Sequence, residues 1–524
     1  MSIRKRKLRF LFIQPNFHRH YVTFFPVYEP LHGLLLGAVV EDLAETRIFD
    51  RRFDTDAALV RLLKEYQPDI VGGTTHTAGE VSTLVRLLDI VKKECPQTRT
   101  IVGGQHATLL PEDFYGPSVD LVCIGPGEET FREVVEAMVG GEDFESVAGL
   151  KVHKQDDHYV QTAPRDLRSG TFSWPKFNRS LIPSRYKRHY FQCFERRTTV
   201  YTITTSGCPF RCNFCSLWAA ARGTFRRRLA AEIAADIACQ PQPYVHLTDD
   251  NTFCDESHAI EIYEHLKAMG VKKKILAYAR ADTIVKKPDL LKLWKEVGLG
   301  ALVVGMEGAS NRHLKAMNKS SEVGLNIEAQ RIMDDLDIEN WAHFVVLPSF
   351  QREDFQEIWD FVEHLQITYP VFIPMTPVPG TPLFFEAKQQ GQLSVFDYGF
   401  YNLQYMVMHT EMPKDLWYEE LATLYRKSCS PRTLWRRRRS PGFHIRPAIG
   451  RAMSMGPVGW RIRPHIREQL ELERNIRYED IEARLPPSLR RDYAPVNYYH
   501  APATMLKTNS NVVNNLTPAT ADAC

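Results

Sequence analysis

The sequence has no run of apolar residues long enough to cross a membrane as a helix, for which about 18 or more in succession are needed. Its N-terminus reads MSIRKRKLRFLFIQPN and begins with positive charge, as a signal peptide does. The apolar part that follows is short, however, and ends at Gln14 and Pro15. We therefore interpret this segment as a first β-strand and predict a cytoplasmic protein.

Closely spaced cysteines are also scarce, because the ten cysteines are scattered over 524 residues apart from one trio. A secreted disulfide scaffold would be short and dense in cysteine. The sequence therefore predicts a reducing compartment. Acidic residues are missing from one region: residues 426–467 hold twelve Lys or Arg and no Asp or Glu, although the net charge of the chain is only +3.

The length of 524 residues exceeds what one hydrophobic core usually serves, so several domains are expected. The composition, 44% hydrophobic and 25% charged, is that of a globular protein. We predict a first domain over 1–145, a linker over 146–198, a barrel over 199–395, a helical and basic region over 396–500, and a disordered tail over 501–524.

Short β-rich runs alternate with amphipathic ones from residue 7 to about 140, which predicts βαβ units and a doubly wound, Rossmann-like α/β domain with a parallel sheet. The expected strands are Leu8–Ile13, Thr46–Phe49, Ile70–Gly73, Thr100–Gly103 and Leu121–Ile124. Helices are expected near 31–43, 55–66, 79–94 and 128–138.

Three loops of this domain follow strands and consist of small and polar residues. In an open parallel sheet, ligands bind where such loops meet helix N-termini. Glycine would let the backbone approach a large ligand, although a Gly-Gly pair after a strand is as often a simple tight turn. The candidate ligand-binding residues are Thr75, His76, Gly103, Gly104, His106, Gly125, Gly127 and Glu128.

A second alternating series begins at Thr199, and six such units in about 200 residues predict a partial or complete (β/α) barrel. Its expected strands are Thr199–Thr204, Tyr244–Leu247, Ile275–Ala279, Ala301–Gly305, Ala342–Leu347 and Val371–Met375.

The cysteine trio follows the first strand of this series, where Cys208, Cys212 and Cys215 stand in a C-x-x-x-C-x-x-C pattern. Three thiolates on one loop can hold three irons of a four-iron, four-sulfur cluster and leave the fourth iron open for chemistry. The alternative is a zinc site, but structural zinc takes four protein ligands, and no fourth Cys or His stands at zinc spacing.

This trio, with Phe214 before its third cysteine, resembles the radical S-adenosylmethionine (SAM) superfamily. The resemblance implies that Cys208, Cys212 and Cys215 hold a [4Fe–4S] cluster whose open iron chelates SAM. It also places Asp249, Asp250, Arg280 and Glu307 near SAM, since each ends a barrel strand. The two aspartates could equally be helix N-caps. Thr376–Pro382 resembles the P-x-P-G-T segment that closes the barrel in such enzymes. No catalytic residue is assigned.

The first domain, placed before such a trio, resembles the cobalamin-binding subclass of these enzymes. The D-x-H-x-x-G motif that supplies a histidine to cobalt in many cobalamin proteins is absent, because the first loop has His18 without the aspartate or the glycine. We therefore expect cobalamin to bind without a protein histidine on cobalt. His76 and His106 could line the corrin or be merely exposed, and the domain could also be empty.

In overall layout the chain resembles the hopanoid C-3 methylase type of enzyme, through Glu29-Pro30-Leu31, the LTDDNTF segment over 247–253, Phe396-Asp397-Tyr398 and Thr410–Pro413. The resemblance implies methylation of an unactivated carbon in an apolar, hopanoid-like small molecule, with electrons from a flavodoxin or ferredoxin type of protein. A magnesium-porphyrin ester cyclase and a non-catalytic cobalamin or redox sensor remain alternatives. A methylthiotransferase is disfavoured, because the N-terminal region offers only Cys95 and Cys123 for a second cluster.

Basic residues alternate with aromatic and aliphatic ones over 426–467, a pattern that suits the anionic inner face of a membrane. A solvated basic face or a nucleic-acid contact would give a similar pattern, but the enzyme reading leads us to expect no nucleic-acid partner. Residues 501–524, rich in Thr, Asn and Ala, predict a disordered tail.

Overall fold

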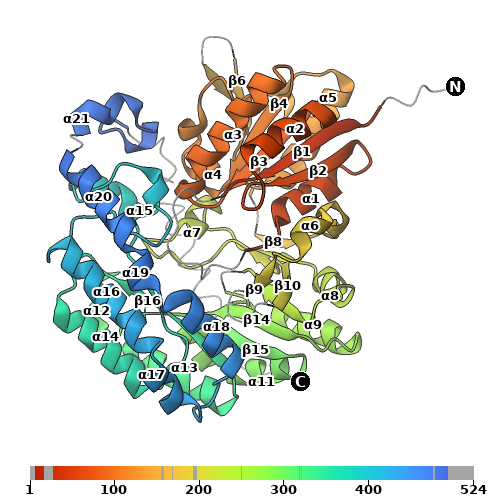
Figure 1. The fold of residues 1–524 in the computed structure, drawn as a ribbon. Coiled ribbons are helices and arrows are strands. Elements are labelled where there is room, and N and C mark those ends of the chain that lie inside the picture. The colour runs from red at the N-terminus through yellow and green to blue at the C-terminus, as the bar shows by residue number, and fades with distance from the viewer. Residues whose placement is uncertain are drawn as a thin grey trace, which may run out of the picture.

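The computed structural model describes residues 6–16, 27–154, 158–167, 169–192, 197–249, 251–317, 319, 321–475 and 478–493. His18, Asp250 and the tail over 501–524 lie outside these residues. Figure 1 shows an N-terminal α/β lobe above a second α/β lobe, with the C-terminal helices running along one side of both.

Five parallel strands form the centre of the N-terminal lobe, in the order β2-β1-β3-β4-β5. This order is that of flavodoxin-like doubly wound folds. The strands are β1 (Leu8–Gln14), β2 (Ala44–Asp50), β3 (Ile70–Thr75), β4 (Arg99–Gly104) and β5 (Leu121–Cys123). All five expected strands are present, with ends shifted by at most two residues.

Helices cover both faces of this sheet because successive side chains along a strand point to opposite sides. Leu11 and Ile13 pack in one core with α2 (Asp56–Tyr66) and α3 (Val81–Glu94), whereas Phe10 and Phe12 pack in another with α1 (Leu31–Val39) and α5 (Gly127–Gly140). The Thr55 side chain accepts a hydrogen bond from the Ala58 N–H and so begins α2.

The segment expected as a linker contributes to both lobes. Its strands β6 (Leu150–His153) and β7 (Tyr159–Gln161) extend the first sheet with antiparallel pairing. Strand β8 (Gly170–Phe172) pairs instead with β12 (Arg226–Arg228), which also pairs with β11 (Thr205–Ser206). η5 (Arg179–Leu181), α6 (Ser184–Lys187) and β9 (Phe191–Gln192) complete this segment. The hairpin of β6 and β7 therefore belongs to the N-terminal sheet, because its backbone groups are satisfied there.

The second sheet is an open, partial barrel in the order β17-β16-β15-β14-β13-β10-β9, in which only β9 is antiparallel. Its parallel strands are β10 (Arg197–Thr202), β13 (Tyr244–Leu247), β14 (Lys274–Ala279), β15 (Leu299–Glu307), β16 (Glu339–Val346) and β17 (Val371–Pro374). All six expected strands are present. The expectation of a partial barrel is confirmed, since β9 and β17 are opposite edges of the sheet.

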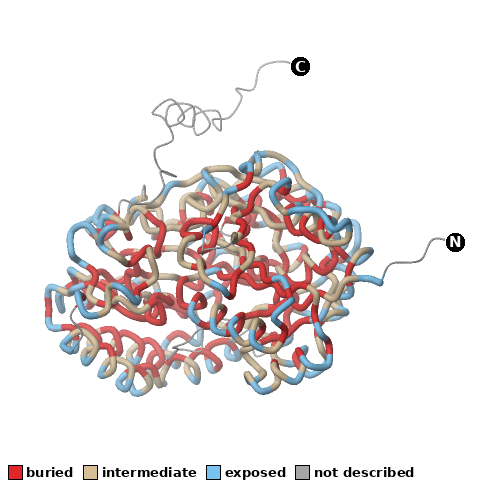
Figure 2. Tube along the Cα trace, turned by 90° about the horizontal axis from the view of Figure 1, so that it is seen from above, coloured by how far each residue is buried: buried red, intermediate tan, exposed pale blue. Residues whose placement is uncertain are grey.

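Helices on the outer side of the barrel connect its strands. They are α8 (Ala230–Ala238), α9 (Glu256–Ala268), α10 (Ala281–Lys286), α11 (Pro288–Glu296), α12 (Asn311–Ala316), α13 (Val323–Asp335) and α14 (Arg352–His364). The short helix α7 (Ser216–Ala220) lies instead between the two lobes (Figure 1). Figure 2 shows buried segments in the interior of the molecule and exposed segments mainly at its rim.

The C-terminal region is helical and returns to the N-terminal lobe. It consists of α15 (Pro382–Gln389), η6 (Tyr398–Phe400), α16 (Lys414–Ser428), α17 (Pro431–Arg437), α18 (Ile445–Met455), α19 (Val458–Arg461), α20 (Arg463–Asn475), α21 (Tyr478–Ile481), η7 (Glu482–Arg484) and η8 (Pro487–Leu489). Ser488 hydrogen-bonds to Asp113 of the N-terminal lobe. Among the described residues, no helix is both long and apolar enough to span a membrane.

Candidate active site

The cysteine trio lies on the loop between β11 and α7, at the end of the first barrel strand, and all three side chains are half-buried. The loop folds back on itself: the Cys215 N–H donates to the Cys212 carbonyl over 3.1 Å, and Trp218 Nε1 donates to the same oxygen over 2.8 Å. Gly207 before the loop has a φ of 84°, and a Cβ there would lie 2.2 Å from the Thr224 carbonyl oxygen. Three thiols gathered on one compact loop fit an iron–sulfur cluster.

Asp249 holds the chain just before this loop. Its buried carboxylate accepts hydrogen bonds from the Thr204 N–H (2.5 Å), the Thr204 hydroxyl (2.5 Å), the Thr205 N–H (3.0 Å) and the Thr252 hydroxyl (3.1 Å). Burial raises the pKa of Asp249, although these hydrogen bonds oppose the shift. Asp249 is not a helix N-cap, because Asp255 caps α9. We therefore interpret Asp249 as a residue that positions the cysteine loop rather than one free to contact SAM.

Arg280 brings a positive charge to the thiols. Its guanidinium lies 3.8 Å from the ring centroid of Phe210, inside the cysteine loop, and pairs with Asp282 over 2.8 Å. Burial opposes the charge, but Asp282 and the nearby Cys212 and Cys208 raise the pKa of Arg280 above its ordinary value. A fixed cation at this place stabilises the thiolate form that binds iron.

Glu307 ends β15 in a left-handed conformation, with a φ of 61°, beside a shift in the pairing of β15 with β16. Its carboxylate pairs with Lys319 over 2.9 Å, and Lys319 also donates to the Gly305 carbonyl. Left-handed geometry costs a non-glycine residue about 1–3 kcal/mol and is often found at functional sites. Glu307 therefore lies where the sequence placed it, but its charge is already paired.

A group of aromatic side chains surrounds His246, and no sequence motif indicated it. The imidazole of His246 lies about 5.5 Å, between ring centroids, from Tyr28, Tyr201 and Tyr278, and it stacks on Tyr278. It is 1% exposed, and neither ring nitrogen has a hydrogen-bond partner within the part of the chain that the structure describes. Burial lowers its pKa to about 3, so this histidine is neutral. His343 on β16 is likewise kept neutral, because burial lowers its pKa to about 4.

The carboxyl edge of the first sheet carries buried polar atoms without partners. The hydroxyls of Thr74 and Thr75, at the end of β3, are buried and make no hydrogen bond to any residue that the structure describes. At the end of β5, two strands along the sheet, a Cβ on Gly125 would meet, among the described residues, only Leu167, at 3.9 Å, and one on Gly127 only the Cys123 sulfur, at 3.6 Å. Unpaired buried hydroxyls and open glycines fit a large polar ligand such as cobalamin at this edge.

The remaining candidates at this edge differ in what they contact. Gly103 has room for a Cβ, whereas Gly104 packs against the Thr75 backbone. His76 is exposed and its ring lies 4.7 Å from that of His32, between centroids. Burial, with His76 nearby, lowers the pKa of His32 to about 3, and burial also raises the pKa of Glu128. His32 carried no sequence signal.

His106 is neither exposed nor on a loop. It lies in a short helix, α4 (Gln105–Leu109), is 3% exposed and hydrogen-bonds through Nε2 to Asp113 over 2.8 Å. Asp113 also accepts hydrogen bonds from Tyr398 over 3.0 Å and from Ser488 over 2.6 Å. The alternative in which His106 is merely exposed is therefore wrong, because its ring is buried in the contact between the N-terminal lobe and the C-terminal region. The alternative in which it lines the corrin stays a prediction.

The cysteine loop and the edge of the first sheet meet directly. Ser216, next to Cys215, donates to Gln105 of α4 over 3.2 Å. The segment 376–382 joins both: a Cβ on Gly380 would lie 2.7 Å from that of Leu109, and the Leu383 N–H donates to the Asn213 carbonyl over 3.1 Å. A ligand at the edge of the first sheet would therefore lie beside a cluster on the cysteine loop.

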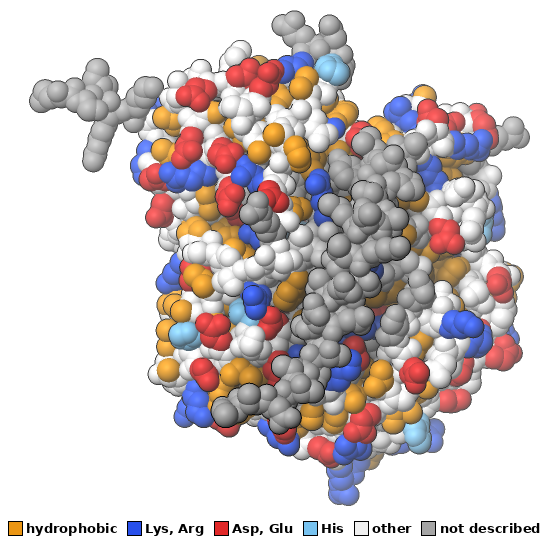
Figure 3. Space-filling model, turned by 180° about the vertical axis from the view of Figure 1, so that it is seen from behind, with side chains coloured by type: hydrophobic (Ala, Val, Ile, Leu, Met, Phe, Trp, Pro, Cys, Tyr) orange, Lys and Arg blue, Asp and Glu red, His pale blue; other side chains and the backbone are white. Residues whose placement is uncertain are grey.

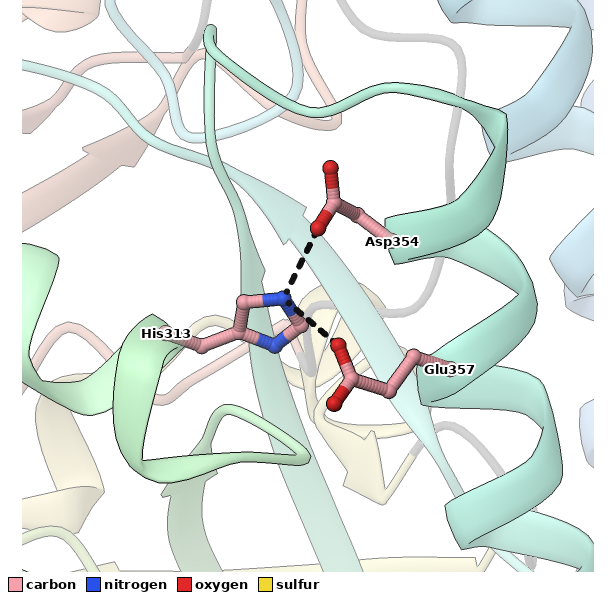
Figure 4. Close-up of side chains that lie close together, drawn as sticks. All are labelled: His313, Asp354 and Glu357. Carbon is pink, nitrogen blue, oxygen red and sulfur yellow. Dashed lines mark hydrogen bonds and ion pairs between the residues drawn. The ribbon is translucent and has the colours of Figure 1, made fainter.

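One group of possible metal ligands lies outside this site, where His313, Asp354 and Glu357 converge (Figure 4). His313 Nε2 lies 3.2 Å from Asp354 and 3.3 Å from Glu357. The Arg312 guanidinium contacts both carboxylates and so already supplies the positive charge. Asp354 also accepts the Gln351 N–H at the start of α14. We interpret this group as an ion-paired helix cap.

Comparison with known families divides the chain in the same way. Residues 23–135 match the family model described as the B12 binding domain, and residues 202–362 match that of the radical SAM superfamily. The two matches coincide with the two lobes.

Several relatives span both lobes. Hopanoid C-3 methylase of Methylococcus capsulatus is 26% identical over 76% of this chain and 78% of its own length. Anaerobic magnesium-protoporphyrin IX monomethyl ester cyclase of Cereibacter sphaeroides is 27% identical over 76% of this chain and 67% of its own length.

Solved structures agree in fold. The radical SAM methyltransferase TsrM of Kitasatospora setae, with tryptophan and a SAM analogue bound, matches with a TM-score of 0.64 and 17% identity over 89% of this chain and 99% of TsrM. OxsB, a cobalamin-dependent radical enzyme with aqua-cobalamin and SAM bound, matches with a TM-score of 0.61 and 15% identity over 97% of this chain and 81% of OxsB.

Proposed function

We propose that this chain, whose residues 23–135 match the B12 binding domain model and whose residues 202–362 match the radical SAM superfamily model, methylates an unactivated carbon of an apolar small molecule. One observation carries the proposal: the cysteine loop and the carboxyl edge of the first sheet touch through Ser216 and Gln105. A methyl donor on one side and a radical source on the other could then act on one substrate between them.

The residues at this contact have distinct tasks in the proposal. Cys208, Cys212 and Cys215 hold the cluster, and Arg280 keeps their thiols ionised. Thr74, Thr75 and the glycines of the first sheet hold cobalamin. When bound, the cluster supplies the electron that cleaves SAM, and cobalamin supplies the methyl group. The barrel keeps water from the substrate, and the neutral His246 and His343 place no charge among apolar surroundings.

We further propose that the substrate is a hopanoid-like lipid and that the electron comes from a flavodoxin or ferredoxin type of protein. The similarity to a hopanoid methylase over three quarters of the chain supports the first point. The similarity to the porphyrin ester cyclase supports a second candidate, in which the same cofactors close a ring without adding a methyl group.

The test is anaerobic reconstitution with iron, sulfide and cobalamin, followed by mass spectrometry of products formed from SAM with a deuterated methyl group. Expression in a hopanoid-producing host that lacks its own methylase should give a lipid heavier by one labelled methyl group. A ring-closed product without the label would support the cyclase instead. If the protein never cleaves SAM under reducing conditions, the proposal fails.

Replacing Cys208, Cys212 or Cys215 with Ala removes one of three thiolates from the loop. Each variant should lose most of its iron and form no 5′-deoxyadenosine. Cys239→Ala is the matched control, because Cys239 is exposed and distant in sequence, and it should keep both. Normal iron content in all three variants would contradict the cluster assignment.

A further inference from the structure

The helices α17, α18 and α19 carry an apolar surface that faces solvent. In the described part of the chain, eight large hydrophobic side chains are exposed, and five of them lie between residues 435 and 460. They are Trp435 (66%), Ile445 (60%), Ile449 (49%), Met453 (59%) and Trp460 (75%). Scattered exposed apolar residues are ordinary, but a concentration in one short stretch indicates a binding surface.

Helix α18 is apolar on the side where a surface helix is usually polar. Ile445, Ile449 and Met453 follow one another at intervals of four residues and therefore form one stripe along the helix. The opposite side, with Ala448, Arg451 and Met455, is buried. Helix α18 therefore packs on the rest of the protein through its other side, and Ile445, Ile449 and Met453 are not needed for that packing.

The polar residues of this surface are all of one sign. From residue 431 to residue 464, every exposed residue is Arg, Pro, Trp, Ile or Met, and no acidic residue occurs. The exposed arginines are Arg432, Arg436, Arg438, Arg439, Arg446 and Arg463. Arg436 pairs with Glu363 of α14, and the Arg438 guanidinium lies 3.9 Å from the ring centroid of Trp435. By contrast, the side of the molecule in Figure 3 mixes acidic and basic side chains.

Two arginines of this region serve another purpose. Arg451 is buried and donates to Cys429 and Ser428, and Arg437 is buried against Glu363. They fix α17 and α18 to the fold, near the N-terminal ends of β16 and β17, where Gly442 bonds to Asp337 and His444 to Tyr369. The surface therefore lies at the end of these strands away from the cysteine loop.

We propose that this surface, defined by Trp435, Ile445, Ile449, Met453, Trp460 and the six exposed arginines, binds the anionic surface of a lipid bilayer. Tryptophan is favoured at the level of lipid headgroups, aliphatic side chains enter the acyl boundary, and arginine pairs with lipid phosphate. The segment 431–464, which has no acidic residue, suits that partner. Because the surface is at the far end of the barrel, it anchors the enzyme and leaves the site open, and it does not depend on the proposed substrate.

The test is pelleting of the full-length protein with sucrose-loaded vesicles of phosphatidylglycerol and phosphatidylcholine, compared with phosphatidylcholine alone. Wild type should bind the anionic vesicles and dissociate at high salt, since salt screens surface charge. Arg438→Gln with Arg439→Gln should weaken binding by about fivefold for each arginine removed.

A second variant, Ile449→Asn with Met453→Asn, tests the stripe and should weaken binding to the same vesicles at every salt concentration by about tenfold or more. The matched control is Met269→Asn with Ile327→Asn, whose side chains are exposed to 48% and 42% on other helices, and it should bind as wild type does. Equal binding of all variants would overturn the proposal. So would a wild-type dimer that the stripe variant dissociates while neither binds vesicles.

Discussion

At the scale of single residues, Asp249 decides how the cysteine loop begins, because four donors converge on its carboxylate. Replacing it with Asn turns two acceptor oxygens into one and leaves a buried donor unsatisfied. A buried donor without an acceptor lowers the free energy of unfolding by about 1–3 kcal/mol.

We predict that Asp249→Asn folds but loses cluster iron, measured as iron per chain after anaerobic reconstitution, with circular dichroism to show folding. Asp289→Asn, on an exposed carboxylate of α11, is the control and should load normally. Full iron loading by Asp249→Asn would show that the loop does not need this anchor.

His246 links pH to stability. Its folded pKa of about 3 lies below the ordinary value of 6.5, so the unfolded state binds the extra proton between these pH values. Stability is therefore full above pH 6.5 and falls as pH drops towards 3, by at most about 1.4 kcal/mol per pH unit for one such group.

We predict that His246→Phe, which keeps an aromatic ring among Tyr28, Tyr201 and Tyr278, reduces the loss of stability between pH 6.5 and 5 by up to about 2 kcal/mol. Denaturant titrations at several pH values measure how the free energy of unfolding of each protein depends on pH. The difference between variant and wild type above pH 7.5 serves as the internal reference for packing alone. An unchanged pH slope would contradict the buried neutral state.

At the scale of elements, the turn from β4 into α4 depends on Gly104. This residue has φ 99° and ψ −171°, a region that is essentially restricted to glycine, and a Cβ would lie 2.4 Å from the Thr75 carbonyl oxygen. The turn brings Gln105 to Ser216 and Leu109 to Gly380.

We predict that Gly104→Ala lowers the free energy of unfolding by at least about 1–3 kcal/mol and weakens cobalamin binding, because β4 must separate from β3. Chemical denaturation and absorbance of bound cobalamin measure the two effects. Gly116→Ala is the control, since a Cβ there meets nothing within 4 Å. If both variants behave alike, the turn does not position the edge of the first sheet.

At the scale of the whole molecule, a buried charge network joins the lobes. Arg179 pairs with Glu29 over 3.0 Å and with Asp236 over 2.6 Å. Arg179 also donates a hydrogen bond to the carbonyl oxygen of Tyr201, and the N–H of Tyr201 donates to Glu29. The backbone of β10 is thus held by side chains of other segments. Removing one partner of a buried pair costs about 3–5 kcal/mol.

We predict that Arg179→Met lowers the free energy of unfolding by about 3–5 kcal/mol. Calorimetry should then show separate thermal transitions for the two lobes. Arg185→Met removes an arginine that is itself mostly exposed and that contacts Asp54 and the Tyr186 hydroxyl, and it should cost only about 1 kcal/mol. A single unchanged transition in Arg179→Met would contradict the role of this network.

The two α/β lobes and their strands could be predicted from the sequence alone, because the period of apolar residues is a local property of the chain. The spacing of Cys208, Cys212 and Cys215 is local in the same way and carried the resemblance to radical SAM proteins. Glu307 was also placed correctly at the end of its strand. The ligand roles of these residues stay predictions.

The contacts of the polar side chains could not be predicted from the sequence. His106 became part of a buried group because Asp113 meets Ser488, 375 positions away, and His246 became neutral because Tyr28 reaches it from the other lobe. The apolar stripe of α18 likewise appeared only when its opposite side was seen buried. Such partners depend on how distant segments pack, and no pattern within one segment of the chain records that packing.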